Sequence, residues 1–172
     1  MIPRIKNILY ATDLSENSAY VFRYAINSAQ KHEAKIHILH VIEKVHPSIE
    51  AQMTMYIDPD RLEKLKKDRI AEQMERIHRR LKEVAQRELG DTPEGLNMIG
   101  SIHVVEGDPA VEILQMMETL NCDILIMGTH GKGWIAQTFL GSVAEKILQR
   151  IRKPVFIIPL PKGGSDIAFK DY

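Results

Sequence analysis

Two glycine-containing clusters in the last third of the chain have the residue types and spacing of a phosphate-binding loop. Gly128-Thr129-His130-Gly131 is followed by nine residues, 132–140, and then by Gly141-Ser142. The apolar run 123–127 precedes the clusters, and an amphipathic segment, 143–151, follows them. A strand, a glycine-rich loop and a helix N-terminus in this order allow backbone N–H groups and the positive helix end to face an anion. A phosphate-bearing ligand is therefore the leading hypothesis.

The energetics of such a loop require several groups to act together. Gly128 and Gly131 lack a Cβ, so phosphate oxygens can approach their amides closely. Gly141-Ser142 adds amides and a hydroxyl at the expected helix start. One helix-end contact with an anion contributes about 0.3–1 kcal/mol when exposed, whereas micromolar binding needs roughly 8 kcal/mol. We therefore expect a cation to take part.

Other phosphate motifs fit the loop less well. A Walker loop counted from Gly128 needs a lysine at position 134, which is Trp134. Residues 131–136 spell a dinucleotide signature, G-x-G-x-x-A, but no acidic residue ends a following strand at the required distance. This signature, and glycines that merely turn the chain, stay open as alternatives.

Five short apolar runs, rich in β-branched residues, each predict a buried strand. They are residues 8–11, 36–42, 99–105, 124–127 and 155–158. Helix-period segments between them predict a single-domain α/β fold, a doubly wound parallel sheet with helices on both faces. Ligands of such sheets bind beyond the carboxyl ends of the strands, where strand order reverses. Both the glycine loop and Thr12-Asp13 fall at that edge.

Three helices are predicted before the glycine loop, and their apolar positions define the faces expected to pack on the sheet. The first follows a cap at Asp13 or Ser15, the second covers about 59–89, and the third follows Gly107-Asp108-Pro109, where Asp108 can cap. The inward positions are Ala19, Phe22, Ala25, Ile26 and Ala29; then Leu62, Leu65, Ile70, Met74, Ile77, Leu81 and Val84; then Val111, Ile113, Leu114 and Met117. The charges of the second helix indicate a solvated face, although its near-heptad spacing leaves a partner helix as an alternative.

Composition narrows the class of protein. A chain of 172 residues fits one domain. Lys plus Arg and Asp plus Glu are 23 each, which argues against nucleic acid and anionic membranes as partners. The single cysteine, Cys122, precedes a strand and is expected to be a small buried hydrophobe. No secretory signal or membrane-spanning run is apparent, so a cytoplasmic protein is expected.

Two segments do not follow the alternation of strands and helices. Residues 45–58 contain Met53, Met55, Tyr56 and Ile57, which predicts a lid over the ligand or a subunit contact. Residues 161–172 have too little apolar content to define a structure, so a flexible tail is expected.

These features together resemble the universal stress protein family, specifically its ATP-binding branch, over residues 6–159. The resemblance is carried by the glycine spacing, by the opening KNILYATDLSENS of residues 6–18, and by Leu39-His40-Val41-Ile42, Gly107-Asp108-Pro109-Ala110 and Lys153-Pro154-Val155. It implies a five-stranded sheet of order 3-2-1-4-5, with the Rossmann-like, HUP-type fold of the adenine nucleotide alpha hydrolases, as the domain in residues 1–160. It also implies ATP with Mg²⁺ or Mn²⁺ as cofactors, and a homodimer paired through 155–158.

The resemblance assigns the site residue by residue. Ala11, Thr12 and Asp13 are implied at the adenosine end, with the Val41 backbone at adenine. The residues implied along the ribose and phosphates are Met127, Gly128, His130 and Gly131, and those implied around the phosphate tail are Gly141, Ser142 and Val143. Ala11 stands where many members have proline or valine, a change that leaves backbone contacts possible.

Several of these residues also have a simpler structural role. Asp13 can bind ligand or cap the first helix, and Ser142 can donate to phosphate or cap neighbouring amides. His37 and His40 are three apart on a strand, so they point to opposite faces and do not form a metal site together. Lys132 can neutralise phosphate or remain in solvent.

Three functions remain in contention. The preferred one is a nucleotide-dependent regulatory module with little or no turnover, which acts on an unknown protein partner. Efficient phosphoryl transfer needs a water-positioning residue and a cation clamp, and no second carboxylate or arginine is identifiable for this task, so a slow Mg-dependent ATPase ranks lower. A structural dimer without nucleotide is the third.

Overall fold

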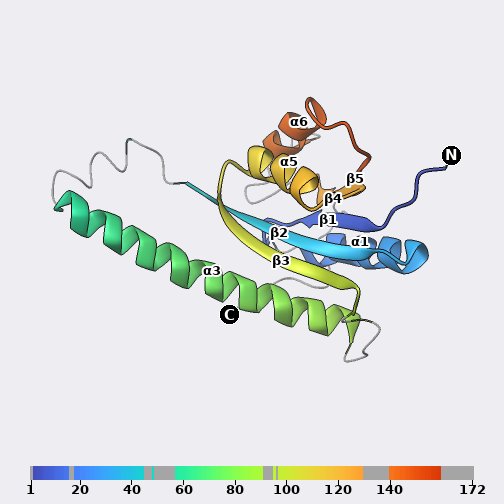
Figure 1. Cartoon of the computed structure of the whole chain (residues 1–172), viewed down its shortest axis with the longest axis horizontal. Helices are drawn as coiled ribbons and strands as arrows, with labels where there is room; N and C mark the ends of the chain where they lie inside the picture. Colours follow the sequence, from blue (N-terminus) through green and yellow to red (C-terminus); the bar gives the residue numbers. More distant parts are fainter. Residues whose placement is uncertain are drawn as a thin grey trace.

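The five apolar runs form the strands of one parallel sheet, with helices between them (Figure 1). This computed structural model describes residues 2–15, 18–44, 48, 57–90, 95, 97–129 and 140–159. The elements are β1 (Asn7–Ala11), α1 (Ser18–His32), β2 (Lys35–Glu43), α3 (Pro59–Leu89), β3 (Ile99–Gly107), α5 (Pro109–Thr119), β4 (Ile124–Gly128), α6 (Ser142–Leu148) and β5 (Val155–Ile158).

The strand order is β3-β2-β1-β4-β5, which confirms the predicted α/β class and topology. β1 pairs with β2 from Asn7↔Lys35 to Ala11↔Leu39. On its other side β1 pairs with β4. The chain therefore leaves β1 toward β2 and returns on the opposite side as β4. The carboxyl ends of β1 and β4 form the point at which strand order reverses.

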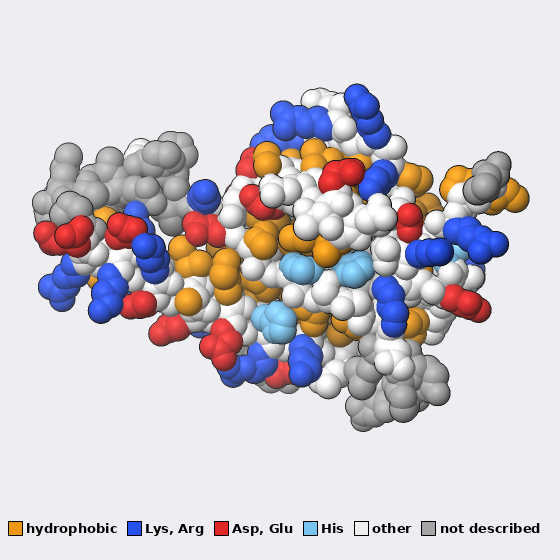
Figure 2. All heavy atoms as spheres, in the orientation of Figure 1, with side chains coloured by type: hydrophobic (Ala, Val, Ile, Leu, Met, Phe, Trp, Pro, Cys, Tyr) orange, Lys and Arg blue, Asp and Glu red, His pale blue; other side chains and the backbone are white. Residues whose placement is uncertain are grey.

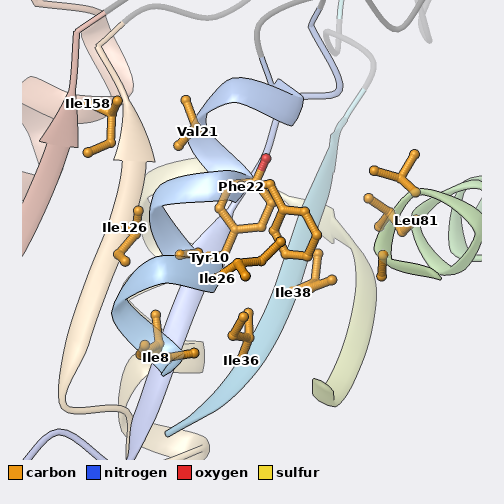
Figure 3. Packing of buried hydrophobic residues seen from close by; sticks show 14 of the residues in the cluster. Ile8, Tyr10, Val21, Phe22, Ile26, Ile36, Ile38, Leu81, Ile126 and Ile158 are labelled. Carbon is orange, nitrogen blue, oxygen red and sulfur yellow. The ribbon is translucent and has the colours of Figure 1, made fainter. Parts of the chain in front are cut away.

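The central strands are apolar on both faces because each face is covered by helices. On one face, α1 and α3 cover alternate strand residues that include Ile8, Tyr10 and Ile38. Figure 3 shows Phe22 and Ile26 of α1 against this face, where the Tyr10 and Phe22 rings stack at 5.1 Å. On the other face, α5 and α6 cover the intervening residues.

Burial of the strands depends on their place in the sheet. The prediction of a buried strand is confirmed for β1 and β4. It is wrong for β3 and β5, which are the two edges: most β3 residues are half-buried, and Phe156 of β5 is 45% exposed. A neighbouring strand is missing on one side of each of these two strands.

The predicted inward face of α1 is confirmed, since all five residues are buried. For α3 the prediction holds at Leu62, Leu81 and Val84, which are buried, and is wrong at Leu65, which is 45% exposed. The physical reason is the angular position of Leu65, which at 100° per residue lies about 160° around the helix from Leu81 and about 100° from Val84.

The outer face of α3 is solvated, as predicted. Glu63 pairs with Lys67 at 2.7 Å and Glu75 with Arg79 at 3.4 Å, both one helical turn apart. Figure 2 shows charges of both signs along this helix. Such exposed pairs contribute little to stability.

In α5 the Asp108 cap is confirmed, because its Oδ1 accepts hydrogen bonds from the amides of Ala110 and Val111. The helix buries Ala110, Ile113 and Met117. The inward position predicted for Val111 is wrong, since that residue is 46% exposed. A helix that starts at this cap turns positions 110, 113 and 117 to the sheet, and 111 lies 100° away from 110.

Some predictions lie outside the described residues. They are the character of 45–58, apart from residues 48, 57 and 58, and the tail at 161–172. Within the described part of the chain, no helix combines the length and apolar character that crossing a bilayer requires.

Candidate functional site

Backbone hydrogen bonds hold the end of β1 to β2 and the end of β4 to β5. The Thr12 amide donates to the Leu39 carbonyl at 2.9 Å, and the Thr129 amide donates to the Ile158 carbonyl at 3.1 Å. The Gly141 amide donates to the Thr129 carbonyl at 2.8 Å. This last bond returns the chain to the end of β4 just before α6, so Gly128 and Gly141 are brought to the same edge of the sheet.

The turn after β1 is tight and strained. Leu14 has φ 59°, a left-handed conformation that is uncommon for a leucine. Its amide donates to the Thr12 hydroxyl at 3.2 Å, and its side chain is buried. Non-glycine residues in this conformation cost about 1–3 kcal/mol and occur where the surroundings hold them. Asp13 is the residue that this turn presents.

The two carboxylate oxygens of Asp13 have different environments. Oδ1 accepts hydrogen bonds from the Ser15 amide at 3.1 Å and from the Ser18 hydroxyl at 3.2 Å. Oδ2 is buried and has no hydrogen-bond partner among the described residues. A buried carboxylate oxygen without a donor is costly. Asp13 thus uses one oxygen to fix the turn before α1 and the hydroxyl of Ser18, the first residue of the helix, and keeps the other as an acceptor. The expected cap at Asp13 is not confirmed, since the amide that it binds, that of Ser15, precedes the helix.

Tyr10 of β1 is hydrogen-bonded to the first residue of α1. Its hydroxyl donates to the Ser18 carbonyl at 2.6 Å. Burial raises the pKa of Tyr10 above its ordinary value, so the hydroxyl stays a neutral donor. Sequence reasoning missed this contact, because the eight-residue separation between the two partners gives no local signal.

The start of α6 lacks a side-chain cap in the described part of the chain. Gly141 occupies the N-cap position with no side-chain cap hydrogen bond, and Ser142 is the first helical residue and is exposed. The capping role considered for Ser142 is therefore wrong. At the same edge, Lys146 of α6 pairs with Asp108 at 3.4 Å. Hydrogen bonds from the Val111 amide and then from Lys146 hold the pKa of Asp108 below its ordinary value.

The remaining predicted residues divide into three groups. Ala11 and Met127 are buried in the α5–α6 side of the core, so their backbones, not their side chains, lie at the sheet edge. Val41 and Val143 are half-buried, and Val41 is paired with Val105 of β3. His130, Gly131 and Lys132 lie outside the described residues, as does the alternative signature at 131–136.

The histidines of β2 point to opposite faces of the sheet, as predicted. His37 Nδ1 lies 2.7 Å from the Ser101 hydroxyl, which in turn lies 2.7 Å from His103 Nε2. His40 Nδ1 lies 2.8 Å from the Thr12 carbonyl oxygen. Among the residues with described positions, no three His, Cys, Asp or Glu side chains are grouped so as to hold a metal ion. Histidines visible in Figure 2 lie over the middle of the molecule, around β2, β3 and α3.

Cys122 is fully buried, as predicted. Burial raises the pKa of its thiol to about 11, so it is an unreactive core residue at neutral pH.

Comparison with known proteins identifies relatives across nearly the whole chain. Universal stress protein MJ0531 of Methanocaldococcus jannaschii is 29% identical over 160 residues, covering 91% of this chain and 84% of the relative. The solved structure of protein MJ0577, from the same organism, is 26% identical with a TM-score of 0.64, covering 94% of this chain and 100% of that chain. A universal stress protein solved in complex with cAMP shares the fold, at 20% identity and a TM-score of 0.59, with 91% and 98% covered.

The universal stress protein family model matches residues 4–159. This span includes every strand and helix named above, and so both β1 and β4, between which the strand order reverses. The chain therefore belongs to the universal stress protein family.

Proposed function

We propose that this protein binds an adenine nucleotide, ATP with Mg²⁺ or Mn²⁺, at the carboxyl edge of the sheet between β1 and β4. The observation that carries the proposal is the buried Oδ2 of Asp13, which no described residue contacts by a hydrogen bond, at the point where strand order reverses. An acceptor of this kind suits an amino or hydroxyl hydrogen of a nucleoside. A ligand that supplies the hydrogen removes the cost of the unsatisfied oxygen.

The family and the position of the site support this proposal. A member of the same fold has been solved with cAMP, an adenine nucleotide. In open α/β sheets, ligands bind at the crevice beyond the carboxyl ends of the strands. In this chain that edge carries the Thr12–Ser15 turn and the start of α6, whose N-cap Gly141 makes no side-chain cap bond.

We assign the parts of the nucleotide to residues as follows. The base and ribose lie by Ala11, Thr12, Asp13 and the backbone of Val41. The phosphates lie by Met127, Gly128, His130 and Gly131, with the terminal phosphates at Gly141, Ser142 and Val143. The amides at the start of α6 and the Ser142 hydroxyl supply donors, and the metal ion offsets the phosphate charge.

The protein acts in this proposal as a regulatory module of the stress response, in which bound and empty states offer different surfaces to a protein partner. Residues 1–160 form the binding domain, and two copies pair through β5. Turnover is slow or absent, because phosphoryl transfer needs a residue that positions water in addition to binding groups. A slow ATPase is the alternative, and a timed assay with Mg-ATP separates the two: several turnovers per minute, lost in Asp13→Ala, would establish the enzyme.

Calorimetry with Mg-ATP on the wild type and on Asp13→Asn tests the site. The amide keeps an oxygen for the Ser15 and Ser18 bonds, and places N–H donors where the proposal requires an acceptor. We expect at least tenfold weaker binding with little change in melting temperature. Asp123→Asn is the matched control, since Asp123 binds the Lys6 and Asn7 amides at the opposite end of the sheet. Equal affinity of Asp13→Asn and wild type would refute the site.

A further inference from the structure

His40 of β2 forms a hydrogen bond that is unusual for a residue in the middle of a sheet. Its side chain is 7% exposed, and its Nδ1 lies 2.8 Å from the carbonyl oxygen of Thr12, just past the end of β1. A carbonyl only accepts hydrogen bonds, so Nδ1 carries the proton and donates. The imidazole thereby connects β2 to the turn that presents Asp13.

This bond replaces one that a regular parallel sheet would make. The Thr12 amide donates to the Leu39 carbonyl, so the Leu39 backbone is directed toward β1. In a parallel strand, alternate residues direct their N–H and C=O groups to the same neighbour. The N–H of Val41 is therefore also directed to the β1 side. If the pairing continued, that N–H would donate to the Thr12 carbonyl.

The pairing of β1 and β2 does not continue. The register ends at Ala11↔Leu39, and the Thr12 carbonyl accepts from the His40 imidazole. With the described residues, this leaves the backbone N–H of Val41 directed past the end of β1. The base is proposed to bind at this edge of the sheet.

The same bond fixes the strained turn. Both polar backbone groups of Thr12 are held, the amide by Leu39 and the carbonyl by His40. The Thr12 hydroxyl accepts from the amide of Leu14, the residue with φ 59°. Asp13 lies between these anchored residues, so its carboxylate has a fixed direction.

We infer that His40 is a positioning residue of the nucleotide site: its imidazole ends the β1–β2 pairing early, directs the Val41 amide toward the base and holds the Asp13 turn. The inference rests on the proposed function for its ligand. Its structural part, the direction of the Val41 amide, stands on the described contacts and can be tested without ligand.

Three variants separate this role from general stability. His40→Leu removes the donor, whereas His40→Asn keeps an N–H donor on the γ carbon, at the place of Nδ1. His37→Leu is the matched control, since His37 lies on the same strand with its side chain on the other face. Melting temperatures are measured for each, together with Mg-ATP affinity by calorimetry. We expect His40→Leu to bind at least tenfold more weakly, and His40→Asn and His37→Leu to bind within threefold of wild type.

Equal affinity of His40→Leu and wild type, or a His40→Asn variant as weak as His40→Leu, would overturn the inference. If His40→Leu does not fold, His40→Gln takes its place, because it moves the donor one carbon farther and is also expected to weaken binding tenfold. Wild-type affinity of His40→Gln would then contradict the positioning role.

Hydrogen exchange of the Val41 amide without nucleotide distinguishes failure of this inference from failure of the proposed function. In the wild type this amide is expected to exchange rapidly. In His40→Leu, or in His40→Gln if it takes that variant's place, the Thr12 carbonyl can accept from it, and exchange is expected to slow at least tenfold. An unchanged rate contradicts the inference. If the wild type does not bind Mg-ATP but the rate changes as expected, the proposed function fails and the structural role of His40 stands.

Discussion

At the scale of single residues, the side chains of Asp13, Ser142 and Asp108 differ in how they are held by the fold. The Oδ1 of Asp13 binds the Ser15 amide and the Ser18 hydroxyl, while its Oδ2, the proposed ligand acceptor, has no partner among the described residues. Ser142 follows Gly141 at the start of α6 and makes no cap bond. Asp108 is a structural cap, with two amides on one oxygen. Substitutions of these residues are therefore expected to separate effects on nucleotide affinity from effects on the free energy of unfolding.

Ser142→Ala is predicted to change nucleotide binding without changing stability. The side chain is exposed and does not cap α6, so the free energy of unfolding should change by less than about 0.5 kcal/mol. Loss of the hydroxyl should weaken Mg-ATP binding several-fold, as measured by calorimetry. A destabilised variant with wild-type affinity would show that Ser142 has a structural role instead.

Asp108→Ala is predicted to show the opposite pattern. Loss of the cap of α5 should lower the free energy of unfolding by about 1 kcal/mol, measured by urea denaturation. Affinity for Mg-ATP should fall by less than threefold, since the Asp108 carboxylate is engaged by Ala110, Val111 and Lys146. Unchanged stability would contradict the capping role.

The cap also predicts a dependence of stability on pH. The pKa of Asp108 is held below its unfolded value, so its contribution is complete above about pH 3.9. It is lost as the pH falls through the lower folded pKa. The difference in unfolding free energy between wild type and Asp108→Asn should therefore shrink in acid. A constant difference from pH 7 to pH 2 would contradict this assignment.

At the scale of elements, the two edge strands differ in what covers them. β3 packs against α3, whose Leu81 and Val84 join the core. β5 is the other edge, and Phe156 is 45% exposed on it. An apolar edge strand is a template for pairing with another chain. This arrangement supports the proposed homodimer through β5.

Phe156→Lys is predicted to disrupt that dimer. A lysine at the centre of the edge places like charges on both copies and removes apolar area. We expect sedimentation to show a dimer for the wild type and a monomer for the variant. Val111→Lys is the control, because Val111 is equally exposed, at 46%, but lies on α5. A wild type that is monomeric at high micromolar concentration would exclude the dimer.

At the scale of the whole molecule, order and spacing of the apolar runs were enough to predict the α/β class, and the family resemblance supplied the strand order that the structure confirms. What could not be predicted depends on three-dimensional neighbours. Leu65 and Val111 are exposed because the phase of each helix relative to the sheet decides burial. The bond from His40 to Thr12 requires the register of β1 and β2, and their separation of 28 residues carries no local pattern.

The location of the candidate site could be predicted from the sequence more fully than the contacts of its residues. The placement of Asp13, Gly128 and Gly141 at one sheet edge follows from the alternation of strands and helices. The different environments of the two Asp13 oxygens do not follow from this alternation, because they depend on Ser18 and on the strained Leu14 turn. The binding roles of these residues stay predictions.

The central claim is that an adenine nucleotide binds at the carboxyl edge between β1 and β4, and a backbone amide NMR map during titration with Mg-ATP tests it most directly. The account predicts saturable shifts concentrated at residues 12–15, at Val41, at 128–129 and at 141–143. A hollow lies at the opposite, amino end of the sheet, lined by residues that include Glu33, Lys35 and Met98. Shifts confined to that end, or none at millimolar Mg-ATP, would contradict the account.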